Sequence, residues 1–441
     1  MWRRVRAASG VWRRTLRGPS RTASRSPLRH PLRRLFLVLG VLGPGLIAAN
    51  AGNDAGGIAT YSAVGARYGY ALIWLMVVIT VSLIVVQEMA ARMGMVTGKG
   101  LAELIRENYG VRWSTFSTVS VLIANLGICI SEFVGIGAAL SLIGVPVQVS
   151  APITAVLIWL LVVRGSYKAA ERIFVAMTIA FFAYPIAAIL ARPDWGAVGK
   201  AAVVPQFHLT SAFLLLFVAT AGTTITPFMQ LYVQSAVVDR GLGVEDLRAE
   251  RIEVATGSIF ANLIACFIIV ATGATLYLNG IHSVGSAADA AKALVPFAGR
   301  FAEILFATGL LGASLLAAAI LPVTAAYVVA ETFGFEKGIA RRPREAPVFV
   351  GVITALLAIG TLVAVIPGVP VIPLLILVQA VNGVLLPVTL FFVWRLASNR
   401  ELMGDHRNSH TFNILAGATV IATSALSLAL LAVTIGGVVG L

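Results

Sequence analysis

The sequence predicts an all-α protein that crosses a membrane about eleven times, and three observations lead to this fold class. Hydrophobic residues make up 59% of the 441 residues and charged residues only 12%, whereas soluble domains are roughly 25% charged. Apolar runs of about 18 to 25 residues, enough to span a bilayer as a helix, recur along the chain. The basic residues gather in alternate loops between these runs, which is typical of a membrane protein.

Eleven apolar segments have the length and composition of transmembrane helices. They are 35–65, 71–93, 115–142, 147–163, 172–191, 210–238, 254–278, 301–333, 348–366, 371–394 and 413–438. If the N-terminus is inside, the inner loops hold all but five of the 33 Lys and Arg residues, the outer five being Arg67, Arg192, Lys200, Lys292 and Arg300. We therefore expect a multi-pass protein of the cell membrane with a cytoplasmic N-terminus and a C-terminus outside.

The chain ahead of the first segment differs in character from the rest. Residues 1–34 carry many Arg residues and no acid, which predicts a basic, disordered cytoplasmic arm before a transmembrane domain at 35–441. The formal charge of +14 is explained by basic loops facing an anionic leaflet, so no nucleic-acid partner is expected. Cys129 and Cys266 both lie inside apolar segments, and their spacing predicts neither a disulfide nor a zinc site.

The first segment is interrupted near its middle by Asn50-Ala51-Gly52-Asn53-Asp54-Ala55-Gly56-Gly57. Glycine in a helix costs about 1 kcal/mol against alanine, and a carboxylate at the bilayer centre costs about 2.5–3.5 kcal/mol on insertion scales. Irregular backbone at membrane depth is tolerated only inside protein or along a cavity. The interruption therefore predicts a functional site around Asp54.

The sixth segment has a matching interruption, Gly222-Thr223-Thr224-Ile225-Thr226-Pro227. Proline removes a backbone hydrogen bond, which frees carbonyl groups beside the threonine hydroxyls. The first and sixth segments are corresponding members of two five-helix repeats, 35–191 and 210–394, with an extra helix at 413–438. Five spans per repeat invert the second one, and paired interruptions in inverted repeats point to the midplane site of a transporter.

The residues at the two interruptions predict what this site binds. Asp54 supplies a carboxylate, and Thr223 and Thr226 supply hydroxyl and carbonyl oxygens from the opposite segment. An all-oxygen site suits hard cations such as Mg²⁺, Ca²⁺ or Mn²⁺. A small number of direct ligands would favour Mg²⁺, which keeps several of its waters.

Several motifs resemble the natural-resistance-associated macrophage protein (Nramp) family of divalent metal transporters. They run in order from residue 43 to about 404: Gly43-Pro44-Gly45, Asp54 to Thr60, Met95 to Glu103, Ser131-Glu132-Phe133, Leu231 to Ser235 and Ser398 to Gly404. The resemblance implies the inverted-repeat fold first seen in a bacterial leucine transporter. It also implies that Asp54, Gly57, Thr223 and Thr226 occupy the metal-site positions of the family.

Departures from the family pattern affect the expected substrate. Family members usually have an Asn where this chain has Gly57, a Met where it has Thr226 and a His where it has Phe228. The thioether that favours softer metals is missing, and such losses resemble the prokaryotic branch regarded as magnesium transporters. A helix 3 Asp that the family links to proton movement is replaced by Cys129, although Glu132 remains.

Three polar residues within apolar segments are candidates for a supporting role. Glu132 is a lone intramembrane acid, which is a functional candidate by default, although a hydrogen bond between helices is the alternative. Gln379 and Asn382 fall where the family has polar residues near the ion. Either amide could contact the ion or its water, or could simply join two helices.

These features predict a secondary transporter that imports a divalent metal ion by alternating access, with Mg²⁺ preferred and Mn²⁺ as second substrate. A membrane potential supplies about 4.6 kcal/mol per dication per 100 mV, so coupling to protons is not required. The alternative is a proton-coupled Mn²⁺/Fe²⁺ transporter of the ordinary Nramp type. The expected partners are the metal ion and the bilayer, with no cofactor, and the chain is expected to be a monomer.

Other functions fit the sequence less well. A cation-coupled carrier of amines or amino acids also breaks two matching helices, but Asp54 would repel a substrate carboxylate. A channel would carry repeated filter sequences or rings of charge, and the sequence has neither. Because there is no His/Glu ligand cluster or nucleophile and base pair on facing segments, we do not expect an enzyme.

Overall fold

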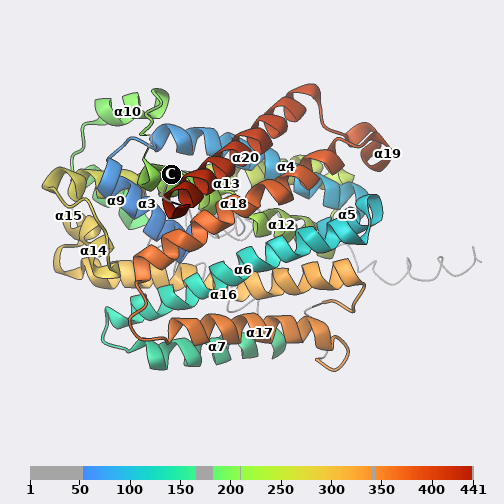
Figure 1. Ribbon diagram of the computed structural model, residues 1–441, viewed down its shortest axis with the longest axis horizontal. Coiled ribbons are helices and arrows are strands. Elements are labelled where there is room, and N and C mark those ends of the chain that lie inside the picture. Colours follow the sequence, from blue (N-terminus) through green and yellow to red (C-terminus); the bar gives the residue numbers. More distant parts are fainter. Residues whose placement is uncertain (1–52, 165–181, 209, 339–342, 440–441) are drawn as a thin grey trace, which may run out of the picture. The chain divides into compact units, whose positions relative to one another are not determined.

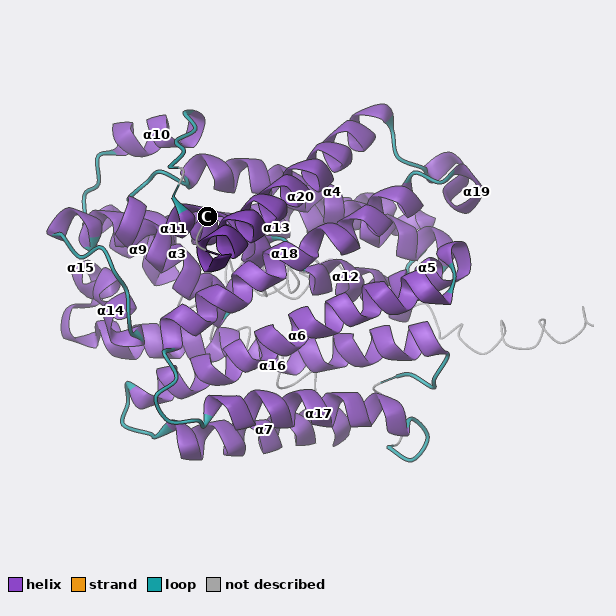
Figure 2. Ribbon diagram, viewed as in Figure 1, coloured by secondary structure: helices purple, strands orange, loops and turns teal. Residues whose placement is uncertain are grey.

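The computed structural model describes four stretches of the chain in which every regular element is a helix (Figure 2): 53–164, 182–208, 210–338 and 343–439. All four belong to the compact unit Gly43–Leu441. A second unit, Met1–Leu42, lies outside the described residues, and so does the arm predicted at 1–34. The described part of the chain confirms the all-α fold class.

Nine helical stretches among the described residues are long and apolar enough to cross a membrane. They are Ile73–Thr97, Val111–Ser141, Val147–Arg164, Ser211–Asp239, Val244–Asn279, Gly299–Phe333, Pro347–Ala364, Val371–Ala397 and His410–Ile435. These match the predicted second to fourth and sixth to eleventh segments. The first and fifth predicted segments lie partly outside the described residues, and α3 (Ala55–Tyr68) and α9 (Ala183–Leu190) are their described ends.

The long helices pack in neighbouring pairs. Helix α6 (Val111–Ser141) lies beside α16 (Ala302–Phe333), and α7 (Val147–Arg164) lies beside α17 (Pro347–Ala364), as Figure 1 shows. Helix α3 packs instead against α11 (Ser211–Thr224), α13 (Leu247–Thr275) and α18 (Val371–Ala397). The helix that follows the first interruption is therefore enclosed by other helices rather than exposed to lipid.

Helix α13 (Leu247–Thr275) begins at Leu247 rather than at the predicted residue 254. The sequence there is rich in charge and was expected to be a loop. In the fold Glu250 is buried, with a carboxylate oxygen 3.8 Å from Arg240 Nη1. Arg251 Nε lies 2.7 Å from Glu88 Oε1. Because these side chains find partners in other helices, the helix continues past its apolar part.

An ion pair is buried within α4 (Ile73–Thr97). Arg92 Nε lies 3.0 Å from Glu88 Oε1, and both side chains are buried. Arg92 Nη2 also donates to Asn408 Oδ1 at 2.6 Å, just ahead of α20 (His410–Val439). The pair therefore ties α4 to the chain that leads into the last helix.

Glycines allow the closest helix contacts near the two interruptions. A methyl group added at Gly65 would lie 1.9 Å from Thr272 Oγ1, because α3 and α13 touch at that point. One added at Gly222, in α11 (Ser211–Thr224), would lie 2.3 Å from the Gln379 carbonyl oxygen of α18. Small residues let helix backbones approach in this way inside membranes, and here the approach brings Gln379 to the sixth membrane helix.

Candidate metal site

Asp54 begins α3 as its N-cap residue and is almost completely buried, with 1% of its surface exposed. Its Oδ1 accepts a hydrogen bond from the Gly57 N–H at 2.6 Å. The N-terminus of a helix presents free N–H groups and a partial positive charge, which stabilise a carboxylate placed there. Gly57 thus contributes through its backbone N–H, which fixes the position of the carboxylate.

The sixth membrane helix is interrupted as the sequence predicts. Helix α11 ends at Thr224 and α12 (Pro227–Asp239) starts at Pro227, with two non-helical residues between them. Because Pro227 has no N–H, the Thr223 carbonyl oxygen cannot accept the usual helical hydrogen bond from the residue four positions later. The Thr226 hydroxyl is buried and has no hydrogen-bond partner among the described residues. The interruption therefore places one unpartnered buried hydroxyl, that of Thr226, beside the break in the described residues.

Two amides of α18 connect the two interruptions. Gln379 Nε2 lies 3.2 and 3.3 Å from the two carboxylate oxygens of Asp54 and donates to them. Asn382 Nδ2 donates to the Gly222 carbonyl oxygen of α11 at 2.8 Å. It also lies 3.4 Å from Gln379 Oε1. The structure therefore brings Asp54, Gln379 and Asn382 into one hydrogen-bonded chain.

Glu132 lies on α6 beside the start of α3. Its Oε2 accepts a hydrogen bond from the Ala55 N–H at 3.4 Å, and its Oε1 is buried without a partner among the described residues. Ala55 directly follows Asp54, so two acids face the same helix N-terminus. The two family positions that differ nearby are both buried: Phe228 is fully buried, and the Cys129 thiol donates to the Leu356 carbonyl oxygen at 3.4 Å.

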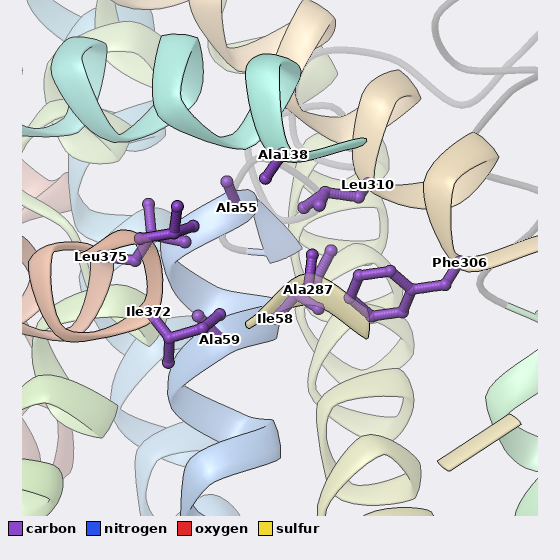
Figure 3. A pocket seen from close by; sticks show the side chains of 10 residues that line it. Ala55, Ile58, Ala59, Ala138, Ala287, Phe306, Leu310, Ile372 and Leu375 are labelled. Carbon is purple, nitrogen blue, oxygen red and sulfur yellow. The ribbon is translucent and has the colours of Figure 1, made fainter. Parts of the chain in front are cut away.

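The space next to Asp54 along α3 is filled by apolar side chains. A cavity of about 10 Å³ lies there, lined by residues that include Ala55, Ile58, Phe306, Leu310 and Leu375 (Figure 3). Such a volume holds about one water molecule. The site is therefore closed on the α3 side in this structure.

Two buried polar contacts near the interruptions were missed from the sequence. Gln230 is fully buried one turn into α12, and its amide, oriented to donate, lies 2.5 Å from the Thr226 carbonyl oxygen and 3.0 Å from that of Pro227. The Tyr61 hydroxyl lies 2.9 Å from Thr224 Oγ1 and joins α3 to α11. A polar residue in an apolar membrane helix is the signal that could have identified both.

Over residues 45–433 the chain matches the family described as natural resistance-associated macrophage protein-like. The chain belongs to this family. It is 27% identical over 414 residues to the divalent metal cation transporter MntH of Yersinia pestis, covering 91% of this chain and 97% of that protein. It is 29% identical over 309 residues to MntH of Deinococcus radiodurans, covering 68% and 70%. These Nramp relatives are named as transporters, so the expectation that the chain is not an enzyme is confirmed.

Solved structures extend the Nramp likeness to the fold. A manganese transporter from Eremococcus coleocola, bound to an aromatic bis-isothiourea substituted compound, has a TM-score of 0.75 at 21% identity over 94% of this chain and 90% of that one. MhsT in complex with L-phenylalanine has a TM-score of 0.58 at 15% identity over 88% and 97%. The predicted leucine-transporter-like fold with its inverted repeat is therefore confirmed.

Proposed function

We propose that this Nramp protein imports a divalent metal ion by alternating access, with Mg²⁺ preferred and Mn²⁺ as second substrate. The observation that carries the proposal is the environment of Asp54. Its carboxylate is buried among helices, and no Lys, Arg or His nitrogen of the described residues lies within 4.0 Å of it. A buried carboxylate without a positive partner is costly, and a bound cation removes that cost.

The neighbouring atoms favour a hard cation. Around Asp54 we assign the ligands to the Thr223 carbonyl, the Thr226 hydroxyl and the Gln379 amide oxygen, with Gly57 holding the carboxylate in place. Gln379 now turns its NH₂ group toward Asp54, so the amide must rotate before its oxygen can face the ion or the ion's water. The nearest sulfur on α12, Met229 Sδ, lies 3.8 Å from Gln87 Nε2 and is engaged there. Oxygen ligands and retained water suit Mg²⁺.

The family positions linked to proton movement support uptake without proton coupling. Two of them hold Cys129 and Phe228 here, so the carboxylate and the imidazole that the family uses at these positions are both missing. Glu132 we assign to the support of the α3 N-terminus and not to a proton path. A membrane potential then drives accumulation, at about 4.6 kcal/mol per dication per 100 mV. Asn382 we assign to the alignment of Gln379 with α11.

The proposal includes the setting of the transporter. Alternate basic loops support a plasma-membrane protein with the N-terminus in the cytoplasm and the C-terminus outside. The proposed repeats are about 35–191 and 210–394, with the extra helix at about 413–438. Because one chain supplies all the proposed ligands, a monomer is sufficient for transport.

Uptake into proteoliposomes tests the proposal. Purified protein is reconstituted with a pH dye inside, a potential is imposed, and Mg²⁺ or Mn²⁺ is added outside. We expect Mg²⁺ uptake that requires Asp54 and does not acidify the lumen. Asp54→Asn removes the charge at the site, and Asp289→Asn, which makes the same change in a surface segment, is the matched control. Mg²⁺ uptake equal in wild type and Asp54→Asn would contradict the assignment.

A second candidate is the ordinary proton-coupled Mn²⁺ transporter, favoured by the manganese transporter among the structural neighbours. In the same vesicles it predicts Mn²⁺ uptake together with acidification of the lumen and no flux of Mg²⁺. That outcome would remove both the Mg²⁺ preference and the uncoupled mechanism, while leaving the metal-transport function in place.

A further inference from the structure

Another buried acid, Glu331, lies at the far end of α16 from the cavity beside Asp54. Its side chain is 2% exposed. Its Oε1 lies 3.1 Å from Lys337 Nζ and 3.5 Å from Ser235 Oγ of α12. Its Oε2 has no hydrogen-bond partner among the described residues. Glu331 is thus held by Lys337, which follows α16, and by Ser235 on α12, the second half of the broken sixth membrane helix.

The connection between α4 and α5 (Leu101–Tyr109) passes between these two helices. Gln234, the neighbour of Ser235 on α12, donates through Nε2 to the Lys99 carbonyl oxygen at 2.9 Å. A methyl group added at Gly100 would lie 2.2 Å from both Glu331 carboxylate oxygens. The Lys99-Gly100 peptide therefore lies in contact with α12 on one side and with Glu331 on the other.

The charges around Glu331 hold the junction together. Gly100 is the N-cap residue of α5, so the positive end of that helix starts beside the carboxylate and stabilises its negative charge. Lys337 Nζ also lies 3.9 Å from Glu103 Oε2 in the first turn of α5. One carboxylate of α16 thus lies against the start of α5 and against Ser235 of α12, and of its two polar contacts the ion pair with Lys337 is the shorter, at 3.1 Å against 3.5 Å for Ser235.

We propose that Glu331 is a positioning residue that holds α12 against α16. It thereby sets how often the proposed metal site becomes accessible from the side of the membrane where α16 ends. The inference rests on the proposed function, because alternating access requires α12 to move relative to the helices around it. Movement of α12 away from α16 separates Ser235 from Glu331. Loss of the Glu331 charge should therefore favour the arrangement in which α12 has moved away from α16.

Accessibility of α12 tests this inference without any metal. Leu231 is 3% exposed and lies one turn before Ser235, on the same face of α12. In a full-length background with Cys129→Ala and Cys266→Ala, Leu231→Cys is labelled with a membrane-impermeant maleimide in inside-out vesicles. We expect Glu331→Gln to raise the labelling rate roughly tenfold, as for the loss of one charge-assisted hydrogen bond.

The matched control is Glu107→Gln, which removes the same charge from a carboxylate that binds Lys99 Nζ at 2.6 Å on the exposed side of α5. Its labelling rate should stay within about twofold of the parent. Ser235→Ala removes the hydroxyl that contacts Glu331 and should raise the labelling rate by about threefold. If Glu331→Gln does not fold, this variant still tests the inference. Equal rates in Ser235→Ala, Glu107→Gln and the parent would overturn the inference.

Metal uptake by the same proteins separates this inference from the proposed function. Unchanged labelling in the variants together with Mg²⁺ or Mn²⁺ uptake by the parent would overturn only the role of Glu331. Absence of uptake of either ion by the wild-type protein would overturn the proposed function, whatever the labelling rates are.

Discussion

The two predicted helix interruptions differ in the polar groups that they contribute to the candidate metal site. In the first, Asp54 supplies a full negative charge that a helix N-terminus and the Gln379 amide hold in place. In the second, Pro227 starts α12 without an N–H of its own, and Thr226 adds a buried hydroxyl that has no hydrogen-bond partner among the described residues. If the proposed function holds, we expect the first interruption to supply most of the free energy of metal binding and the second to adjust geometry and selectivity.

The largest effect is expected at Asp54. Asp54→Asn keeps the shape of the side chain and removes its charge, so the affinity for Mg²⁺ should fall by about 100-fold, as for the loss of one member of a buried charge pair. Isothermal titration of purified protein with Mg²⁺ measures this change. The apo protein should be no less stable than wild type, since an unpaired buried charge has been removed. A loss of less than about threefold would mean that the charge is not the main contribution.

The helix break is tested by Pro227→Ala. An alanine N–H at position 227 can donate to the Thr223 carbonyl oxygen, which would make α11 and α12 more continuous and withdraw that oxygen from the ion. We expect metal uptake to fall by roughly tenfold, with a small fall in melting temperature, because the unfolded chain gains conformational freedom when a proline is replaced. Pro347→Ala is the control, because Pro347 is also the first residue of a helix, α17. Equal effects of the two substitutions would argue against a specific role of the break.

Gly56→Ala examines how Gln379 reaches Asp54. A methyl group at Gly56 would lie 2.0 Å from Gln379 Nε2, so the amide must leave the carboxylate. We expect a fall in Mg²⁺ affinity of about fivefold, measured by titration, for the loss of one polar contact. At Gly199, in the helix α10 (Trp195–Val203), nothing lies within 4 Å of the added methyl. Gly199→Ala should therefore leave the affinity unchanged.

The smallest effect is expected at Thr226. Thr226→Val replaces a hydroxyl that has no partner among the described residues by a methyl group of similar size. Stability should change little, because no hydrogen bond is lost, and Mg²⁺ uptake should fall by about threefold. Initial uptake rates and a thermal melt measure the two quantities. A large loss of stability with normal uptake would mean that the hydroxyl supports the fold instead of the site.

The sequence by itself determined the all-α character of the described residues, the nine apolar helices long enough to span a membrane, and the position of the break in the sixth membrane helix. These features depend on local composition: apolar length sets a span, and Gly, Pro and Asp within a span disrupt it wherever they occur. The break between Thr224 and Pro227 was predictable for this reason. The start of α13 was not, because the partners that bury Glu250 and bind Arg251 lie in other helices.

Only the tertiary structure decided which polar groups meet. Asp54 and Gln379 are 325 positions apart, Tyr61 and Thr224 are 163 apart, and Ser235 and Glu331 are 96 apart. Side-chain contacts over such separations depend on how helices cross and on glycines that permit close approach, such as Gly56 and Gly100. The sequence predicted a site at Asp54, and the packing of α18 against α3 and α11 determined that the Gln379 amide holds its carboxylate, because that contact requires all three helices to be in place.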